Sequence, residues 1–194
     1  MLSQGRVRDA TLVSLLAYAG LRPGEALALT WGDVRQRTIS VERSASMGVI
    51  KDTKTRRSRT VPLLGPLAQD LAAWRLASGR PDDRKLLFIG KDGGPLTEGQ
   101  WNRWQEGIFR QSARAAGAEG ARAYDLRHSF VSLLINEGIS ILEVARQAGH
   151  TPTMALEVYG HVFDELDPSE RVSAEAQIRS ARDELVPVSY LAAD

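Results

Sequence analysis

All three histidines and two of the four tyrosines of this 194-residue chain lie in one short stretch of sequence. His128, His150 and His161 lie within 34 residues, and Tyr124 and Tyr159 fall in the same stretch. A single histidine is usually an ordinary surface or core residue. Because the chain has no other histidine, the clustering favours a functional site over three unrelated residues.

Arginine is the second component of this pattern. Arg127 stands beside His128 in the first turn of an expected helix, where free backbone N–H groups and the helix dipole favour an anion. Arg22 stands in a turn between two expected helices. A guanidinium holds two phosphate oxygens at once, and a tyrosine supplies an oxygen nucleophile. The set is suited to phosphoryl transfer without a metal.

Other enzyme classes lack the residues they need. The chain has no cysteine, which excludes disulfide scaffolds, cysteine-based zinc sites and a thiol nucleophile. His150 and His161 are eleven residues apart and lack the paired carboxylate of H-E-x-x-H. Neither a G-x-S-x-G pentapeptide nor a G-x-x-x-x-G-K-[ST] phosphate loop occurs. We therefore expect neither a metal nor a cofactor.

Apolar periodicity and helix-end signals predict a mainly α fold with a small antiparallel β-sheet, an α+β class. A proline, a capping residue or a glycine marks most of the expected helix ends. Helices are expected over 8–19, from 23, over 66–78, 97–116, 125–138, 140–149, 151–160 and roughly 168–184. Strands are expected over 38–42, 48–51 and 58–63. We expect one domain over 1–165 and a C-terminal tail over 166–194.

Charge is unevenly distributed, although the formal net charge is only +1. Residues 1–161 carry 22 bases and 16 acids, whereas 162–194 carry eight acids and three arginines. Residues 51–59 (KDTKTRRSR) alone hold five bases and one acid. Such asymmetry favours a polyanionic partner for the basic part. No stretch has the length of a membrane span or the pattern of a signal peptide, so we expect a soluble cytoplasmic protein without membrane contact.

Four segments in order resemble the motif boxes of the tyrosine recombinases, or phage integrases. They are GLRPGEALALTW (20–31), DTKTRRSRTVPL (52–63), YDLRHSFVSLL (124–134) and AGHTPTMALEVYGH (148–161). The resemblance extends from about residue 8 to 165 and includes the nine-residue step from His150 to Tyr159. It implies the catalytic-domain fold of DNA breaking-rejoining enzymes, and site-specific recombination through a 3′-phosphotyrosine without metal or ATP.

The same resemblance implies a role for each matching residue. Tyr159 is the nucleophile, Arg22 and Arg127 hold the non-bridging phosphate oxygens, and His150 donates to the same phosphate. Lys54 protonates the leaving 5′-oxygen, with Lys51 as the alternative. The supporting residues are Glu25, His128, placed as a helix-start residue near the site, and His161, placed to position the tyrosine helix. The expected contacts to the DNA backbone are Lys51, Arg56, Arg57 and Arg59, within the basic segment.

The chain departs from the family pattern at one catalytic position. Tyr124 stands where the family usually has a histidine, three residues before the second arginine. A phenol donates to phosphate but is a poor general base near neutral pH. Tyr124 is therefore retained as a catalytic candidate, either as a phosphate ligand or as a packing residue, and the identity of the general base stays open.

The resemblance also implies partners. We expect double-stranded DNA, a monomer in free solution and a homotetramer on DNA, at the nucleoid. The tail either docks on a neighbouring protomer or is a solvated end; its candidate docking residues are Val172, Ala176, Ile178 and Leu185. The family's N-terminal DNA-clasping domain is absent from this sequence, so we expect weak DNA binding by this piece alone. Two alternatives remain: a type IB topoisomerase or telomere resolvase, and a non-catalytic DNA-binding relative.

Overall fold

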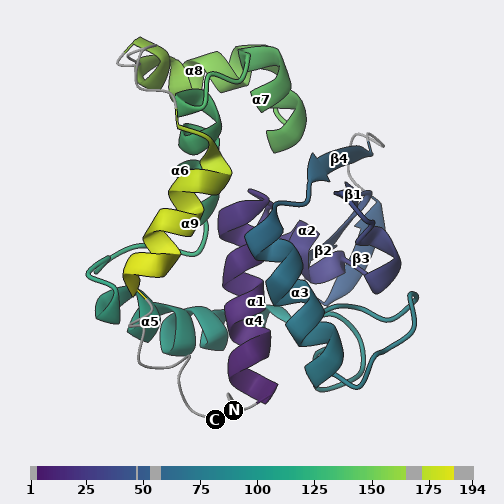
Figure 1. The fold of residues 1–194 in the computed structure, drawn as a ribbon. Coiled ribbons are helices and arrows are strands. Elements are labelled where there is room, and N and C mark those ends of the chain that lie inside the picture. Colours follow the sequence, from purple (N-terminus) through teal and green to yellow (C-terminus); the bar gives the residue numbers. More distant parts are fainter. Residues whose placement is uncertain (1–3, 47, 53–57, 165–171, 186–194) are drawn as a thin grey trace.

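The computed structural model describes residues 4–46, 48–52, 58–164 and 172–185, which form a mainly helical body with a few short strands (Figure 1). The helices are α1 (Gln4–Tyr18), α2 (Pro23–Ala28), α3 (Gly65–Ala77), α4 (Glu98–Trp104), α5 (Arg110–Ala115), α6 (Asp125–Asn136), α7 (Ile141–Ala148), α8 (Pro152–Asp164) and α9 (Ala174–Leu185). The strands are β1 (Thr38–Val41), β2 (Arg43–Ser46), β3 (Val49–Asp52) and β4 (Arg59–Pro62). The expected α+β class is confirmed. None of the described helices combines the length and apolar character needed to cross a bilayer.

The strands pair differently from the single sheet that the sequence predicts. β1 pairs antiparallel with β4, and β2 pairs antiparallel with β3, as two separate two-stranded sheets within the described residues. β2 was not expected, because its sequence RSAS lacks the β-branched residues typical of strands. Gly48, with φ +76°, allows the tight turn that brings β3 back onto β2. Pairing across that turn, rather than local propensity, makes this strand.

Several helix ends follow their local signals, but two of the expected helices differ from their predicted course. Thr97 and Gln100 form the expected capping box at the start of α4, and Ser140 caps α7. The expected helix over 97–116 is interrupted by a π-helical turn, Gln105–Phe109, that joins α4 to α5. α8 does not end at Gly160 but continues to Asp164. It continues because Tyr159 and Val162, on either side of that glycine, both pack into the same apolar cluster.

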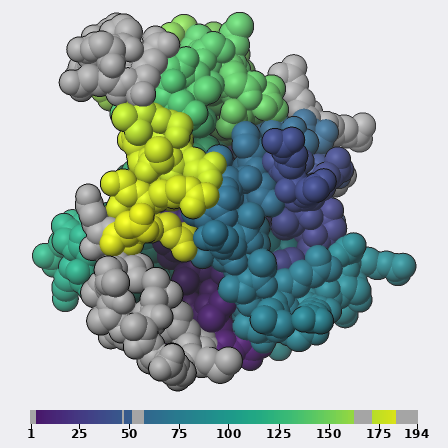
Figure 2. Space-filling model, in the orientation of Figure 1, coloured from purple at the N-terminus to yellow at the C-terminus, as the bar shows by residue number. Residues whose placement is uncertain are grey.

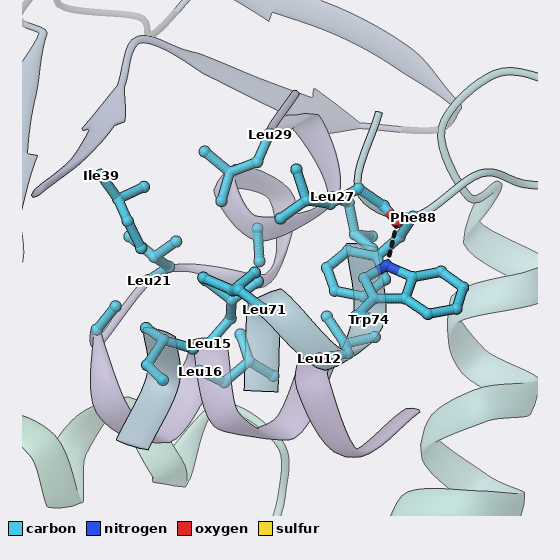
Figure 3. Packing of buried hydrophobic residues seen from close by; sticks show 14 of the residues in the cluster. Leu12, Leu15, Leu16, Leu21, Leu27, Leu29, Ile39, Leu71, Trp74 and Phe88 are labelled. Carbon is cyan, nitrogen blue, oxygen red and sulfur yellow. Dashed lines mark hydrogen bonds between the residues drawn. The ribbon is translucent and has the colours of Figure 1, made fainter. Parts of the chain in front are cut away.

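Two apolar clusters hold the body together. The larger joins α1, α2, α3, β1 and β4, with Leu15, Leu16 and Ile39 completely buried (Figure 3). Trp74 closes one side of it and donates its indole N–H to the Leu87 carbonyl at 2.8 Å. The second cluster joins α6, α7 and α8, together with Ala174 of α9. The site described below lies where elements of the two clusters meet.

Helix α9 packs on its own chain, against α3 and α6 (Figure 2). Ala174 and Ile178 are buried there. Arg182 donates to both carboxylate oxygens of Asp70 at 2.9 and 3.0 Å, which ties α9 to α3. The tail helix therefore begins later than the expected 168, and residues 165–171 lie outside the description. Docking of the tail on a neighbouring protomer stays a prediction; Val172 and Ala176 are exposed, and the side chain of Leu185 lies outside the description.

Candidate active site

A buried carboxylate at the start of α2 holds two arginines. Glu25 is only 3% exposed, and its two oxygens accept from Nη1 and Nη2 of Arg59 at 2.8 and 2.6 Å. Arg22, which precedes α2, donates its backbone N–H and its Nη1 to the same carboxylate at 2.9 and 3.0 Å. Burial alone would raise the pKa of Glu25, but the hydrogen bonds and charges of Arg59 and Arg22 lower it to about 2. Glu25 is therefore an anion that fixes both guanidinium groups.

A third arginine stands in the first turn of α6. Arg127 has no exposed surface and donates to the carbonyls of Gly20 and Ala148. Its Nη2 also lies 3.0 Å from Nε2 of His150. Burial and then the charge of Arg22 lower the pKa of Arg127 to about 10, so the group is still a cation at neutral pH. The site thus contains three guanidinium groups and one carboxylate, which leaves an excess of positive charge.

All three arginines donate hydrogen bonds to backbone carbonyls at the C-terminal end of α7. The carbonyls of Gln147, Ala148 and Gly149 accept in turn from Arg59, Arg127 and Arg22. The last carbonyls of a helix have no partner within the helix, and the helix dipole makes this end negative. Gly149 ends the helix in the left-handed conformation, with φ +65°. The turn between α7 and α8 is therefore built against the positive cluster.

His150 follows this turn and is neutral at pH 7. Burial, followed by the charges of Arg127, Arg22 and Arg59, lowers its pKa to about 4. With Nε2 accepting from Arg127, the imidazole proton is on Nδ1, which is buried and has no hydrogen-bond partner among the described residues. The His150 ring also lies nearly parallel to that of Tyr159, with centroids 6.2 Å apart. His150 thus offers one unused N–H donor within the site.

Tyr159 points from α8 toward the start of α6. The residue is 3% exposed, and its hydroxyl lies 2.8 Å from Nδ1 of His128. Burial raises the pKa of Tyr159, and the positive charge of Arg127 only partly opposes this. Tyr124, 38% exposed, packs edge-on against His128 with ring centroids 5.1 Å apart. Both tyrosines therefore lie next to the imidazole of His128.

The structure brings together most, not all, of the residues singled out from the sequence. Arg22, Glu25, Arg127, His150 and Tyr159 meet in one place, as does His128. His161 is exposed on α8, and Lys51 is exposed on β3. Lys54, Arg56 and Arg57 lie outside the described residues.

Arg59, which is expected from the sequence to contact the DNA backbone, is largely buried within the site. Its side chain is 8% exposed and is held by Glu25 and the Gln147 carbonyl. The contact of His128 with the hydroxyl of Tyr159 was not foreseen either. No local signal could have indicated it, because the two residues are 31 positions apart and meet only through the packing of α6 on α8. Within the described ranges, no three acidic or histidine side chains gather as metal ligands would.

Sequence comparison with known proteins identifies the family of this chain. The sequence pattern of the phage integrase family matches residues 2–165. The chain belongs to the phage integrase family. Tyrosine recombinase XerC of Roseiflexus castenholzii is 29% identical over 94% of this chain and 58% of its own length. An integrase of Streptomyces ambofaciens is 34% identical over 75% of this chain and 42% of its own length.

A solved structure shares the fold of this integrase-family chain. The XerH site-specific recombinase, bound to palindromic difH substrate, aligns with a TM-score of 0.66 at 23% identity. The alignment covers 85% of this chain and 45% of XerH. The fold is thus the tyrosine recombinase catalytic-domain fold that the motif boxes predict. The chain spans about half the length of the curated relatives it matches.

Proposed function

We propose that this chain is the catalytic part of a site-specific DNA recombinase. Tyr159 attacks a backbone phosphate, forms a 3′-phosphotyrosine link and releases a 5′-hydroxyl; rejoining is the reverse attack, without metal or ATP. The observation that carries the proposal is the tyrosine hydroxyl in a site with three arginines and one carboxylate. A dianionic, pentacoordinate phosphorus is the species that such a charge excess stabilises. Membership of the phage integrase family supports the same chemistry.

The arginines differ in solvent exposure, and this difference sets the order in which they would meet an incoming phosphate. The side chain of Arg22 is 35% exposed, so an incoming phosphate meets it first. Arg127 has no exposed surface, and Tyr159 and His150 lie on its side of the site. A phosphate therefore reaches Arg127 only after the side chains that cover it, His150 among them, shift. His150 then supplies its Nδ1–H, and removal of one such donor typically costs on the order of 10²–10³ in rate.

The proposed partner is double-stranded DNA, which places the protein at the nucleoid in the cytoplasm. XerH is described as bound to its difH substrate, which supports a DNA partner for a chain of the same fold. The basic segment 51–59 is proposed to follow the DNA backbone, with Lys54, or Lys51, as the acid that protonates the leaving oxygen. We further propose a monomer in solution that assembles as a homotetramer on DNA, with the tail joining neighbouring protomers.

The test is formation of a covalent DNA complex. The chain is incubated with a pool of randomised duplexes, each nicked so that cleavage releases a short 5′-hydroxyl fragment and traps the adduct. A denaturing gel then detects the adduct, and sequencing identifies the DNA site. We expect an adduct with the natural chain and none with Tyr159→Phe. Bound DNA without any adduct would instead support a non-catalytic relative, and plasmid relaxation without exchange between duplexes would support a topoisomerase.

A further inference from the structure

We propose that His128 is the general base that takes the phenolic proton of Tyr159 when the tyrosine attacks DNA. The inference rests on the proposed function and assigns a role that the motif boxes leave open, because Tyr124 replaces the histidine that the family usually has. With its own proton on Nε2, the imidazole of His128 accepts the Tyr159 hydroxyl hydrogen at Nδ1, across 2.8 Å. This is within the reach required of a general base.

The placement of His128 suits proton transfer. The residue follows Arg127 in the first turn of α6, so the arginine points into the protein while the half-buried histidine faces α8. Tyr124, one turn earlier, packs edge-on against the imidazole at 5.1 Å and limits its rotation. Within the described part of the chain, the Tyr159 hydroxyl has no hydrogen-bond partner other than His128. The tyrosine hydroxyl is therefore already directed at an acceptor before DNA arrives.

The other candidate bases are poorly suited. The Nε2 lone pair of His150 is directed at Arg127, and protonation there would place two cations 3.0 Å apart. Accordingly, burial and the charge of Arg127 lower the pKa of His150 to about 4. Within the described residues, neither ring nitrogen of His150 forms a hydrogen bond with the Tyr159 hydroxyl, which lies instead at His128. Tyr124 is a phenol, which takes up no proton near neutral pH.

A base is needed because the phenol of Tyr159 ionises poorly where it stands. Burial raises its pKa above the ordinary value of 10.0. In the proposed step, the Tyr159 oxygen bonds to phosphorus as the bond from phosphorus to the 5′-oxygen breaks. The phenolic proton passes to Nδ1 of His128, and the 5′-oxygen takes a proton from the acid proposed above. Rejoining reverses both transfers, and His128 returns its proton to the departing phenolate.

The test compares three variants in the covalent-complex assay, using the DNA site selected with the natural chain. His128→Ala removes the base, and His128→Asn keeps a hydrogen-bonding atom near the Nδ1 position but takes up no proton. Ser129→Ala is the matched control, because the hydroxyl of this exposed residue on the same turn donates to the Asp125 carbonyl and, within the described residues, to no other group. We expect both His128 variants to cleave about 10²-fold more slowly at pH 7, as loss of a general base typically costs 10²–10⁴. DNA affinity and thermal unfolding should change little.

Two further measurements distinguish proton transfer by His128 from a purely structural role of this residue. Cleavage by His128→Ala should rise with pH beyond the point where the natural chain levels off, and added imidazole should restore part of the rate. The groups that face His128, and so shape this profile, are Tyr124, Asp125, Arg127, His150 and Tyr159. Wild-type cleavage by His128→Asn, or no response of His128→Ala to alkali and imidazole, would overturn the inference. If the natural chain itself forms no Tyr159 adduct, the proposed function fails instead.

Discussion

Replacing Gly149 by alanine should displace the arginine side chains of the site, although no charged residue is mutated. The glycine has φ +65°, a conformation that costs an L-residue about 1–2 kcal/mol. A Cβ added there would lie 2.9 Å from Nη1 of Arg59 and 3.1 Å from Nη1 of Arg22. The ends of long side chains normally move aside easily. Here they are held by Glu25 and by the carbonyls of α7, so movement must break charge-assisted hydrogen bonds.

The magnitude follows from these two contributions. Loss of one or two hydrogen bonds to a charged group adds about 1.5–3 kcal/mol to the backbone cost. Gly149→Ala should therefore lower the free energy of unfolding by about 2.5–5 kcal/mol. Because Arg22 is also displaced, the rate of covalent-complex formation should fall by about 10²-fold or more.

Gly117→Ala supplies the matched control for this experiment. Gly117 has φ +74°, and an added Cβ would meet no atom within 4 Å. It should lose only the backbone contribution of about 1–2 kcal/mol and retain the cleavage rate. Urea unfolding and the adduct assay measure both quantities in both variants. Equal losses of stability, with cleavage unaffected in Gly149→Ala, would refute the claim that this turn positions the arginines.

Two further predictions concern the ion pairs. The pKa of Glu25 falls from 4.5 to about 2 on folding, so its stabilisation is complete above about pH 4.5 and is lost as the pH falls toward 2. Glu25→Gln should therefore remove about 3 kcal/mol at pH 7 and flatten the acid limb of the stability curve, measured by urea unfolding at stepped pH; an unchanged limb would contradict this. Arg182→Ala should free α9 from Asp70, with a loss of about 1 kcal/mol and faster proteolysis within 174–185. Arg179→Ala, which removes the ion pair with Glu175 inside α9 and leaves Arg182 paired with Asp70, should be proteolysed at the natural rate.

Local signals predict the parts of this fold that depend on neighbouring residues. The Thr97 capping box and the left-handed Gly149 are visible in the sequence because each depends on a few adjacent positions. Strand β2 is not visible, because its RSAS sequence becomes a strand only by pairing with β3. The continuation of α8 past Gly160 likewise depends on what Tyr159 and Val162 contact.

The candidate site divides in the same way. Its residues could be collected from the sequence, because reactive types were concentrated there and resembled known motif boxes. Which residue contacts which could not. Arg59 looks like one more cation of a basic segment until β4 brings it against Glu25, and His128 looks like a helix-start residue until α8 packs across it. Contacts between distant segments are set by tertiary packing, which a single sequence does not display.

Because the three arginines are held at the end of α7, their side chains lose conformational entropy when the protein folds and not when a ligand binds. An arginine side chain carries about 2 kcal/mol of rotamer entropy, which a free surface arginine surrenders when it grips a ligand. Here Gln147, Ala148 and Gly149 have already restricted all three side chains in the folded protein. The entropy cost therefore lowers the stability of the fold, and it does not lower the affinity for DNA in the proposed complex. A phosphate that enters exchanges with peptide oxygens that already hold the guanidinium groups in place, and the side chains that cover Arg127 must shift before it reaches that residue.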